Sequence, residues 1–502
     1  MHGGSKMSEF SRRSFLEAAG GGVAALALSR AGDAHGADRP GRRPNVVFAF
    51  ADDWSWPHAG IAGDPVVKTP HFDRVAREGV LFPNTFVPAP SCAPARASVL
   101  TGQWHWRLEQ GANLHGTLPA KFAVYPDLLE RAGYFVGYTG KGWGPGKVQA
   151  GGRERNPAGP RFPDFGQFMK QRPDDAPFCF WFGSTNPHRP YERGSGVESG
   201  MDPEKAAVPE CLPEAEVVRS DVCDYYYEVQ QFDTQLGKLL QILEEAGELE
   251  NTIVVVSGDN GMPFPRCKST LYDLGTRVPL AIRWGDAVSP GRRVEDFVSL
   301  CDLAPTFLQA AGVELPDAMT GRSLLPLLNS EKSGRVDPER DSVLTGKERH
   351  HGKCREGGVG YPMRAIRTHD YLYIRNFTPW RWPGGSPWIT SSQGIYSDYD
   401  DGPTKRYMIK HSGQKGVGRL FDLCFGMRPG EELYDLGKDP GQVNNVADRA
   451  EYAEVKKQLS TELMRRLKRT GDPRAFGKGE AFDGYPYYTG YGMESILPEM
   501  YK

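Results

Sequence analysis

A cysteine, a proline and an arginine lie close together in the stretch SCAPARASVLTG, residues 91–102. Pro94 suits the first turn of a helix, which would put Cys92 at the N-terminal end. Free backbone N–H groups and the helix dipole favour an anion there. Arg96, four residues after Cys92, returns to the same helix face one turn later. The stretch therefore combines a nucleophile, a cation and an anion-binding helix end.

Acidic and amide side chains follow two apolar runs that are far apart in the chain. These are Asp52-Asp53 after residues 46–50, and Asp259-Asn260 after residues 253–256. Ligands of open α/β sheets bind beyond the carboxyl ends of the strands, where such pairs could meet. Together the pairs could supply oxygen ligands to a hard cation such as Ca²⁺ or Mg²⁺. Taken alone, each pair is better explained as turn formers or helix caps.

Two further polar segments follow apolar runs in the same way. Lys141 comes after residues 134–138, and His188 lies in the segment NPHR, residues 186–189, after residues 178–182. Both would reach the same edge of a sheet.

The elements that would position these groups alternate between strand and helix patterns, which predicts an α/β domain around a mostly parallel sheet. Predicted strands are short and apolar, as strands buried on both faces should be. They cover residues 46–50, 134–138, 178–182, 253–256 and 280–282; helices are predicted over residues 71–79, 125–132 and 223–246.

After about residue 340 the sequence becomes rich in Gly, Pro, Tyr and Trp, which predicts a smaller antiparallel domain. Residues 371–375 read as one of its strands, and residues 447–470 as a closing amphipathic helix. The tail from Gly471 is expected to wrap a surface without an element of its own. We place a catalytic α/β domain at residues 38–345 and the C-terminal domain at residues 346–502.

The charge balance of the chain argues against nucleic acid and anionic membranes as general partners. Lys plus Arg number 61 against 63 Asp plus Glu, so no general attraction to nucleic acid or anionic membranes is expected.

Residues 11–16 (SRRSFL), an apolar run over 18–28 and small residues to 37 are typical of a twin-arginine signal. The run is too short to span a bilayer. We therefore predict export by the twin-arginine machinery to the periplasm or beyond, without stable membrane insertion.

Residues 92–96 (CAPAR) with residues 100–102 (LTG) resemble the signature of type I sulfatases. In that family the cysteine is converted to formylglycine by a formylglycine-generating enzyme, and its hydrated aldehyde is the nucleophile. The resemblance implies an alkaline-phosphatase-like fold and a Ca²⁺ site, with Mg²⁺ as the alternative. The implied metal ligands are Asp52, Asp53, Asp259, Asn260 and the residue derived from Cys92.

Within the family, the sulfamidase branch (heparan N-sulfatase) shows further similarity. The shared segments are residues 258–265, 320–326, 361–364 and 432–435, with counterparts of NPHR and of His350-His351. Such stretches indicate common ancestry more securely than a common substrate.

The resemblance also implies roles for the cationic and imidazole side chains. Arg96, Lys141 and Lys268 would balance the charge of the sulfate oxygens, and His188 would protonate the leaving group. The predicted substrate contacts are His350, His351, Arg364 and His115. One departure stands out, because Trp143 takes the place of a family His, and Trp cannot exchange a proton.

The sequence therefore predicts a sulfatase acting on a sulfated sugar, with N-sulfoglucosamine and O-sulfated glycans as competing substrates. Two other functions stay open. A phosphoester or phosphonate hydrolase could use the same scaffold, since phosphate and sulfate esters share a tetrahedral geometry. A non-catalytic glycan binder would explain the missing His but not the intact nucleophile.

Overall fold

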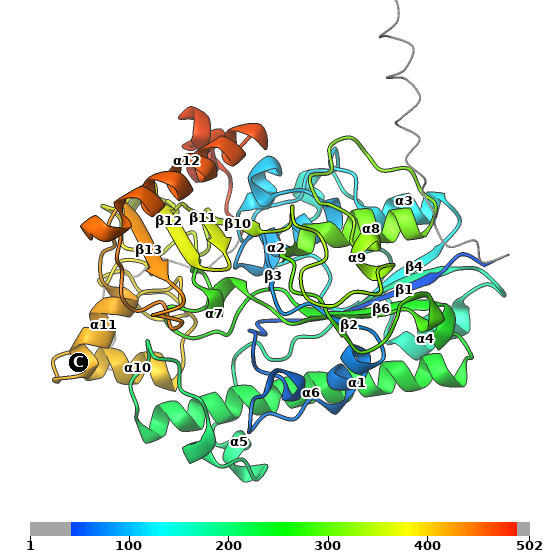
Figure 1. Ribbon diagram of the computed structural model, residues 1–502, viewed down its shortest axis with the longest axis horizontal. Helices are drawn as coiled ribbons and strands as arrows, with labels where there is room; N and C mark the ends of the chain where they lie inside the picture. Colours follow the sequence, from blue (N-terminus) through cyan, green and yellow to red (C-terminus); the bar gives the residue numbers. More distant parts are fainter. Residues whose placement is uncertain (1–41, 489–502) are drawn as a thin grey trace, which may run out of the picture. The chain divides into compact units, whose positions relative to one another are not determined.

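The computed structural model describes residues 42–488, and the described residues from Arg43 onward form one compact unit (Figure 1). The predicted signal, residues 1–37, and residues 489–502 of the predicted tail lie outside the described residues. No helix in the described part of the chain has the length and apolar composition needed to cross a membrane.

A seven-stranded sheet with the strand order β4-β5-β1-β6-β7-β2-β8 organises the first part of the chain. Strand β1 lies between β5 and β6, is parallel to both, and is buried along its whole length. Its apolar sequence after Asn45 suits that central place. The strands are β1 Asn45–Ala51, β2 Val80–Leu81, β4 Phe135–Gly140, β5 Phe178–Gly183, β6 Thr252–Gly258, β7 Leu280–Arg283 and β8 Arg292–Arg293.

All five predicted strands are present, with ends displaced by at most two residues. The predicted mostly parallel sheet is confirmed for β4, β5, β1 and β6. Strand β7 instead runs antiparallel to both β6 and β2. A small pair, β3 Thr85–Phe86 and β9 Val298–Ser299, lies outside this sheet.

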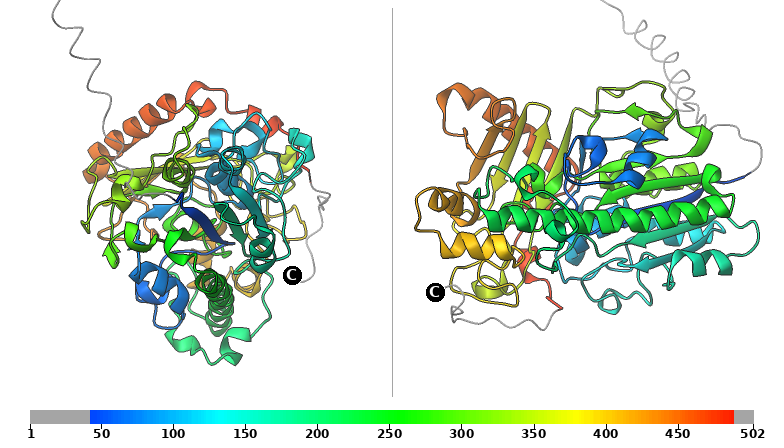
Figure 2. Two further views of the ribbon diagram at one scale, coloured as in Figure 1. Left: turned by 90° about the vertical axis from the view of Figure 1, so that its right-hand side faces the viewer. Right: turned by 90° about the horizontal axis from the view of Figure 1, so that it is seen from below.

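Helices cover both faces of the sheet. Alternate residues of β1 therefore pack into two different hydrophobic clusters, one on each face. Val47 and Ala49 pack with residues of α1 and α6, whereas Phe48 and Phe50 pack with residues of α2, α3 and α8. Figures 1 and 2 show α6 running along one face of the sheet and α3 and α8 on the other. The bounds are α1 Pro70–Arg77, α2 Cys92–Thr101, α3 Tyr125–Arg131, α6 Glu216–Glu245 and α8 Leu303–Ala310.

Helix α6 begins at Glu216, earlier than the predicted start at residue 223, because the buried Val218 and Val222 extend its apolar stripe. The shorter helices are α4 Phe165–Gln171, α5 Ser195–Glu198, α7 Asp273–Thr276 and α9 Leu325–Leu328.

The C-terminal part contains the predicted antiparallel sheet, in the order β10-β11-β12-β13. Its first strand crosses the predicted domain boundary at residues 345/346. Helix α12 covers this sheet with Leu463 and Leu467, and α10 and α11 lie between β12 and β13 in the sequence. The elements are β10 Ser342–Lys347, β11 Met363–Thr368, β12 Tyr371–Asn376, α10 Pro403–Lys410, α11 Val417–Phe425, β13 Glu431–Asp435 and α12 Ala453–Arg469.

The tail after Gly471 differs from its prediction, because it forms a 3-10 turn at Pro473–Phe476 and the short helix α13 at Ala481–Gly484. Its last described residues are tied to the body of the protein. The Arg349 guanidinium donates to the carbonyl oxygens of Tyr485 and Pro486, and the Tyr488 N–H donates to the His115 carbonyl.

Candidate active site

Two acidic and amide pairs meet at the carboxyl ends of β1 and β6. The strands are parallel and in register, with Ala51 opposite Gly258, so the residues that follow each strand become neighbours. The Asp53 N–H donates to Asp259 Oδ1 at 3.0 Å. Asp53 has a positive φ of 74°, an uncommon conformation for a residue other than glycine. The convergence expected from sequence is therefore a direct consequence of the β1–β6 register.

Cys92 is the first residue of α2, at the helix end predicted from Pro94. Its thiol donates to Asp52 Oδ1 at 3.3 Å and accepts from Asn260 Nδ2 at 3.7 Å. Burial, reinforced by the charge of Asp52, raises the pKa of the Cys92 thiol well above its ordinary value. The unmodified side chain is therefore a neutral thiol set among carboxylate and amide groups.

The chemistry of this cluster fits a hard divalent cation. Ligand atoms of Asp52, Asp53, Cys92 and Asp259 all lie within 4.8 Å of one another. Two buried oxygens, Asp53 Oδ1 and Asn260 Oδ1, have no hydrogen-bond partner among the described residues. Carboxylate and amide oxygens are the ligands that Ca²⁺ and Mg²⁺ take, and buried acceptors of this kind are normally satisfied.

The charges of the cluster lead to the same conclusion. Burial raises the pKa of Asp53 to about 7, with Lys268 opposing the shift, and burial followed by Asp52 raises the pKa of Asp259 to about 6. Burial also acts on Asp52, but Lys141 and other nearby cations hold its pKa far below the usual value. A divalent cation would stabilise the ionised forms of all three carboxyl groups.

Three cations surround the cluster. Arg96 Nε donates to Asp259 Oδ2 at 2.8 Å, and Lys268 Nζ lies 2.7 Å from Asp53 Oδ2. Lys141 forms an ion pair with Asp52. The second terminal nitrogen of Arg96, Nη2, is buried without a hydrogen-bond partner among the described residues. An anion bound here would supply an acceptor for that donor.

A glycine contact fixes the backbone at Lys141. A Cβ on Gly183, the last residue of β5, would lie 1.8 Å from the Lys141 carbonyl oxygen. Glycine therefore lets the β5 end approach the Lys141 backbone, whose carbonyl accepts from Arg96 Nη1 at 2.8 Å.

His188 lies beside the cluster with part of its side chain open to solvent. Its Nε2 is 3.9 Å from Asp53 Oδ2, and 32% of the side chain is exposed. Its Nδ1 is hydrogen-bonded to the Arg189 carbonyl oxygen, which leaves Nε2 facing the site. Burial, followed by the charge of Lys268, lowers the pKa of His188.

The other predicted histidines also lie near the cluster. His350 Nδ1 is hydrogen-bonded to the hydroxyl of Ser91, the residue before Cys92, at 2.8 Å. The pKa of His115 is lowered to about 4 by burial and then by His351 and Lys141. The charges of His351 and Lys141 therefore reach His115. The rings of His115 and His351 both contact the tail residue Tyr487.

The predicted substrate contact at Arg364 is wrong. Arg364 lies on β11 and is fully buried, and its guanidinium is paired with Glu348 and Asp472. Its remaining nitrogen donates to the carbonyl oxygens of Lys347 and Met363. All of its donor nitrogens are thus bonded inside the protein. The shared motif at residues 361–364 preserves a structural ion-pair cluster.

Sequence reasoning missed Asp400, which lies between β12 and α10. Its carboxylate is 3.0 Å from Lys268 Nζ, and its ligand atom groups with those of Asp53 and His188 within 4.8 Å. No strand end points to it, and only the acidic run at residues 398–401 marks the segment. Trp143, at the position of the family His, is buried, and its indole N–H has no partner among the described residues.

Fold and site together place the protein among α/β proteins whose site can bind an anion beside a cation-binding cluster. Comparison with protein families is consistent with this class. The family model described as Sulfatase matches residues 44–147 and 161–313. A second model, described as N-sulphoglucosamine sulphohydrolase, C-terminal, matches residues 266–378. The chain belongs to the sulfatase family.

Individual relatives agree with that assignment. The chain is similar to human N-sulphoglucosamine sulphohydrolase, with 30% identity covering 86% of this chain and 91% of the relative. It is 28% identical to an ulvan-active sulfatase of Formosa agariphila, over 86% of this chain and 76% of the relative. A structure of a protein in complex with its substrate D-glucosamine-2-N,6-O-disulfate has a TM-score of 0.61. That match, at 20% identity, covers 86% of this chain and 99% of the other and shows the shared fold.

Proposed function

We propose that this sulfatase removes a sulfate group from a sulfated sugar by means of a formylglycine derived from Cys92 and a divalent cation. The observation that carries the proposal is the position of the Cys92 thiol. It contacts Asp52 and Asn260 within a cluster that also leaves two buried oxygen acceptors unpaired. A structural cysteine gains nothing from such surroundings, whereas an oxygen nucleophile beside a cation does.

Conversion of Cys92 explains how a weak nucleophile can serve here. A buried thiol with a raised pKa is not a thiolate at neutral pH. A hydrated aldehyde at the same position carries two hydroxyl groups on one carbon. One hydroxyl loses its proton, and its oxygen attacks sulfur while the bond from sulfur to the sugar oxygen or nitrogen breaks. The other hydroxyl then loses its proton, the C=O bond re-forms, and sulfate leaves.

The surrounding residues supply charge and a proton. A bound Ca²⁺, or Mg²⁺ in its place, would be held by Asp52, Asp53, Asp259 and Asn260 and would polarise the sulfuryl oxygens. Arg96, Lys141 and Lys268 balance the negative charge that develops on the sulfate. His188 donates a proton from Nε2 to the departing sugar atom when its ring is doubly protonated, while its Nδ1–H stays bonded to the Arg189 carbonyl.

We propose N-sulfoglucosamine as the first substrate, supported by the C-terminal family match at residues 266–378 and by the human relative. An O-sulfated sugar is the second candidate, supported by the similarity to the ulvan-active sulfatase. The two relatives have nearly equal identity to this chain, so a measurement of sulfate release must decide between the two candidate substrates.

The test is sulfate release from N-sulfoglucosamine, O-sulfated glucosamine, galactose and fucose, an aryl sulfate and an aryl phosphate. Peptide mass should first verify conversion of Cys92, and Cys92→Ala serves as the control. Release from N-sulfoglucosamine alone supports a sulfamidase, and release only from an O-sulfated sugar supports the second candidate. Preferential turnover of aryl phosphate, or equal activity in Cys92→Ala, would overturn the proposal.

We also propose that residues 1–37 direct export by the twin-arginine route to the periplasm or beyond. Support comes from the paired Arg12 and Arg13 ahead of a short apolar run. Replacing both arginines by lysine should retain the protein in the cytoplasmic fraction. Unchanged fractionation of that variant would contradict twin-arginine export.

A further inference from the structure

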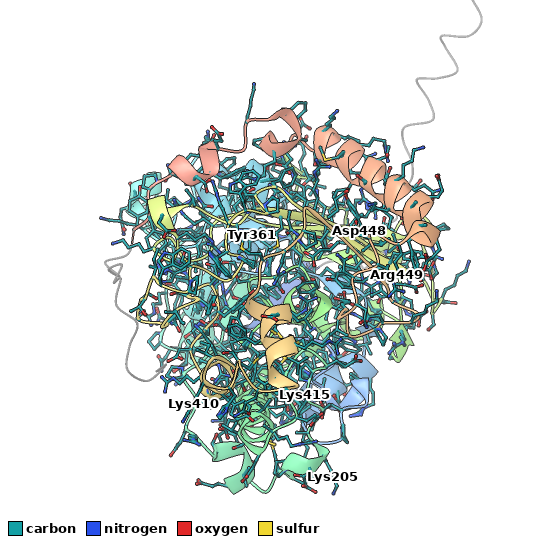
Figure 3. The ribbon with its side chains drawn as sticks, turned by 90° about the vertical axis from the view of Figure 1, so that its left-hand side faces the viewer. Lys205, Tyr361, Lys410, Lys415, Asp448 and Arg449 are labelled. Carbon is teal, nitrogen blue, oxygen red and sulfur yellow. The ribbon has the colours of Figure 1, made fainter. Side chains whose placement is uncertain are left out.

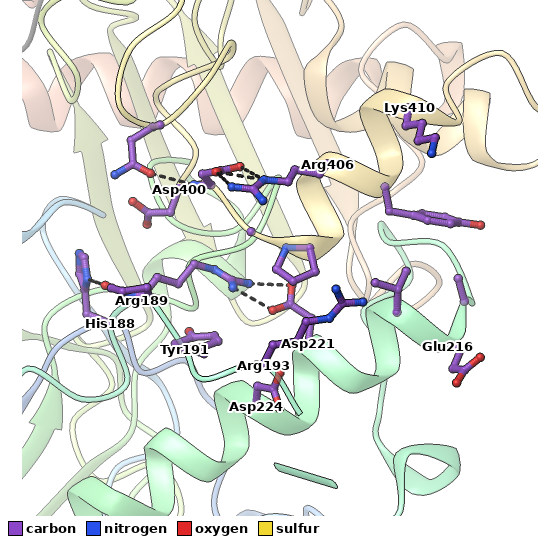
Figure 4. A pocket seen from close by; sticks show the side chains of 18 of the residues that line it. His188, Arg189, Tyr191, Arg193, Glu216, Asp221, Asp224, Asp400, Arg406 and Lys410 are labelled. Carbon is purple, nitrogen blue, oxygen red and sulfur yellow. Dashed lines mark hydrogen bonds and ion pairs between the residues drawn. The ribbon is translucent and has the colours of Figure 1, made fainter. Parts of the chain in front are cut away.

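A cavity of about 480 Å³, called the second cavity below, lies apart from the active site. The cavity of about 910 Å³ in Figure 4 contains His188 and Asp400 and so belongs to the catalytic cluster. In the described part of the chain, the two cavities are lined by different residues. The walls of the second cavity include residues 207–211 before α6 and residues 440–442 after β13, and Cys211 and Arg266 are among its lining residues. The second cavity therefore gives a small molecule a route to Cys211.

Three buried thiols meet beside this cavity, and we call Cys211, Cys267 and Cys424 the thiol trio. They come from the segment before α6, the segment after β6 and the end of α11, and they belong to one hydrophobic cluster. The Cys424 thiol donates to the Cys211 carbonyl oxygen at 3.3 Å. All three are free cysteines. The chain segments that lead to Cys211 and to α11 reach one side of the molecule, where Figure 3 shows Lys205 and Lys415.

The three thiols differ in their electrostatic state. Hydrogen bonds from Cys267 and then Cys424 lower the pKa of the Cys211 thiol well below its ordinary value, with Arg266 adding to the shift and burial opposing it. Burial, followed by the bond to Cys211, raises the pKa of the other two thiols. Cys211 is therefore the thiolate of the trio, and two S–H groups donate to it. A thiolate near a cation reacts with oxidants faster than a buried neutral thiol does.

Arg266 holds both its charge and two of the thiols in place. Its guanidinium donates to the Leu423 carbonyl oxygen at 3.0 Å and lies 3.6 Å from the centre of the Tyr272 ring. Arg266 directly precedes Cys267, and Leu423 directly precedes Cys424. The same contacts therefore fix the backbone next to the two thiols that donate to Cys211.

A metal ion shared by the thiol trio is not favoured. Among the described residues, the groups of His, Cys, Asp and Glu whose ligand atoms all lie within 4.8 Å of one another do not include the trio. Contacts that centre on one sulfur suit a disulfide instead, because a disulfide joins only two sulfur atoms. Cys424 is the better partner for Cys211, since its thiol also contacts the Cys211 backbone.

We propose that the thiol trio is an oxidation site, at which a peroxide converts Cys211 to a sulfenic acid and Cys424 then forms a disulfide with it. In the first step the Cys211 sulfur bonds to one peroxide oxygen and the O–O bond breaks. The other oxygen takes up the proton that the Cys211 thiol has lost and leaves as water or an alcohol.

The second step closes the disulfide. The Cys424 sulfur bonds to the Cys211 sulfur, the S–O bond breaks, and the departing hydroxide takes the Cys424 thiol proton and leaves as water. Two thiols are thereby oxidised to one disulfide, and the peroxide accepts the two electrons. The co-reactant is a peroxide small enough to enter the second cavity.

The test treats the wild-type protein with hydrogen peroxide, blocks the remaining thiols with N-ethylmaleimide in denaturant and maps the peptides by mass spectrometry. We expect a peptide pair joined through Cys211 and Cys424, lighter than the reduced pair by two hydrogen atoms and separated again by dithiothreitol. Cys179, a buried thiol of β5, is the internal control. The free thiol of Cys211 should be lost at least about 10-fold faster than that of Cys179, because a thiolate is the reactive form.

Two variants separate the two steps. In Cys424→Ser the hydroxyl can still donate to the Cys211 sulfur, so Cys211 should still be oxidised. With dimedone present, we expect Cys211 as a dimedone adduct or as a disulfide with Cys267. In Cys211→Ser, both Cys267 and Cys424 should stay reduced at the peroxide dose that oxidises the wild type. Thermal midpoints report the folding of both variants, and the wild-type mapping requires neither of them.

Three results would overturn the proposal. The first is loss of the Cys211 thiol no faster than that of Cys179. The second is a peroxide-induced disulfide in the wild type that omits Cys211, and the third is oxidised Cys211 with Cys424 still free. These measurements do not involve sulfate release, so they succeed or fail independently of the proposed function.

Discussion

Two buried clusters, each made of oppositely charged side chains, lie in different parts of the molecule. They differ in how completely their polar atoms are hydrogen-bonded within the protein. Around Arg364, in the C-terminal part, Asp472 and Glu348 accept from the guanidinium at 2.6 and 2.7 Å. Arg474 provides Glu348 with a second cation. Around Cys92, by contrast, Asp53 Oδ1, Asn260 Oδ1 and Arg96 Nη2 have no hydrogen-bond partner among the described residues.

The contrast distinguishes a structural cluster from a binding cluster. Burying a charge is costly unless it is paired and hydrogen-bonded, so a fully paired cluster can serve the fold alone. Oxygens and a nitrogen that lack hydrogen-bond partners, close together, match a cation and an anion from outside the chain. Amino-acid type does not make this distinction, since both clusters consist of Arg, Asp and related residues.

The largest expected effect comes from removing the nucleophile. Cys92→Ala should lower sulfate release by at least about 10⁴-fold, as loss of a covalent nucleophile does in other hydrolases. Its thermal midpoint should stay near that of the wild type, because only one small group is lost. Cys179→Ala, at another buried cysteine in β5, is the control and should keep its activity. Substantial activity in Cys92→Ala would show that the cluster is not catalytic.

Removal of the cation is the next test of the binding cluster. Asp259→Ala should abolish stoichiometric binding of Ca²⁺ or Mg²⁺ and lower kcat by about 10³-fold, the scale of losing one preorganised electrostatic contact or more. Metal content after dialysis, measured by mass spectrometry, checks the first effect. Asp302→Ala is the control, because this acidic residue pairs with Arg340 away from the cluster. A metal content equal to that of the wild type would rule out a shared site at Asp259.

The structural cluster should respond in the opposite way. Arg364→Met leaves Asp472 and part of Glu348 without their cation, and breaking a buried ion pair costs about 3–5 kcal/mol of unfolding free energy. Urea unfolding measures that loss, while kcat per folded molecule should change less than about threefold. If kcat fell strongly without loss of stability, Arg364 would belong to the substrate site after all.

The sequence predicts the site residues that follow regular strands better than those that lie in irregular segments. The β1 and β6 runs are apolar on both faces, so their strand ends, with Asp52 and Asp259, could be placed at one edge. Asp400 could not, because it comes from a segment between β12 and α10 that has no periodic pattern. The direction of β7 escaped prediction as well, since a short apolar run does not determine strand polarity. Arg364 was misassigned because a shared motif does not reveal whether its side chain is paired.

The smallest expected effect is on the pH dependence of stability. It comes from a buried ionisable group that stays neutral in the folded protein, unlike the charged groups of the two clusters. His58 is buried, its Nδ1 is 3.2 Å from the Tyr225 hydroxyl, and burial lowers its pKa to about 4, with Asp64 opposing the shift. The unfolded imidazole takes up a proton below about pH 6.5, which the folded one resists until about pH 4. The stability that His58 contributes is therefore complete above pH 6.5 and is lost progressively as the pH falls towards 4. Between pH 7 and 5 the loss amounts to about 2 kcal/mol.

Comparing the pH dependence of urea unfolding in the wild type and in His58→Gln isolates this contribution. An unchanged slope in the variant would mean that His58 takes up its proton at the same pH in the folded and the unfolded protein, and so does not contribute to the pH dependence.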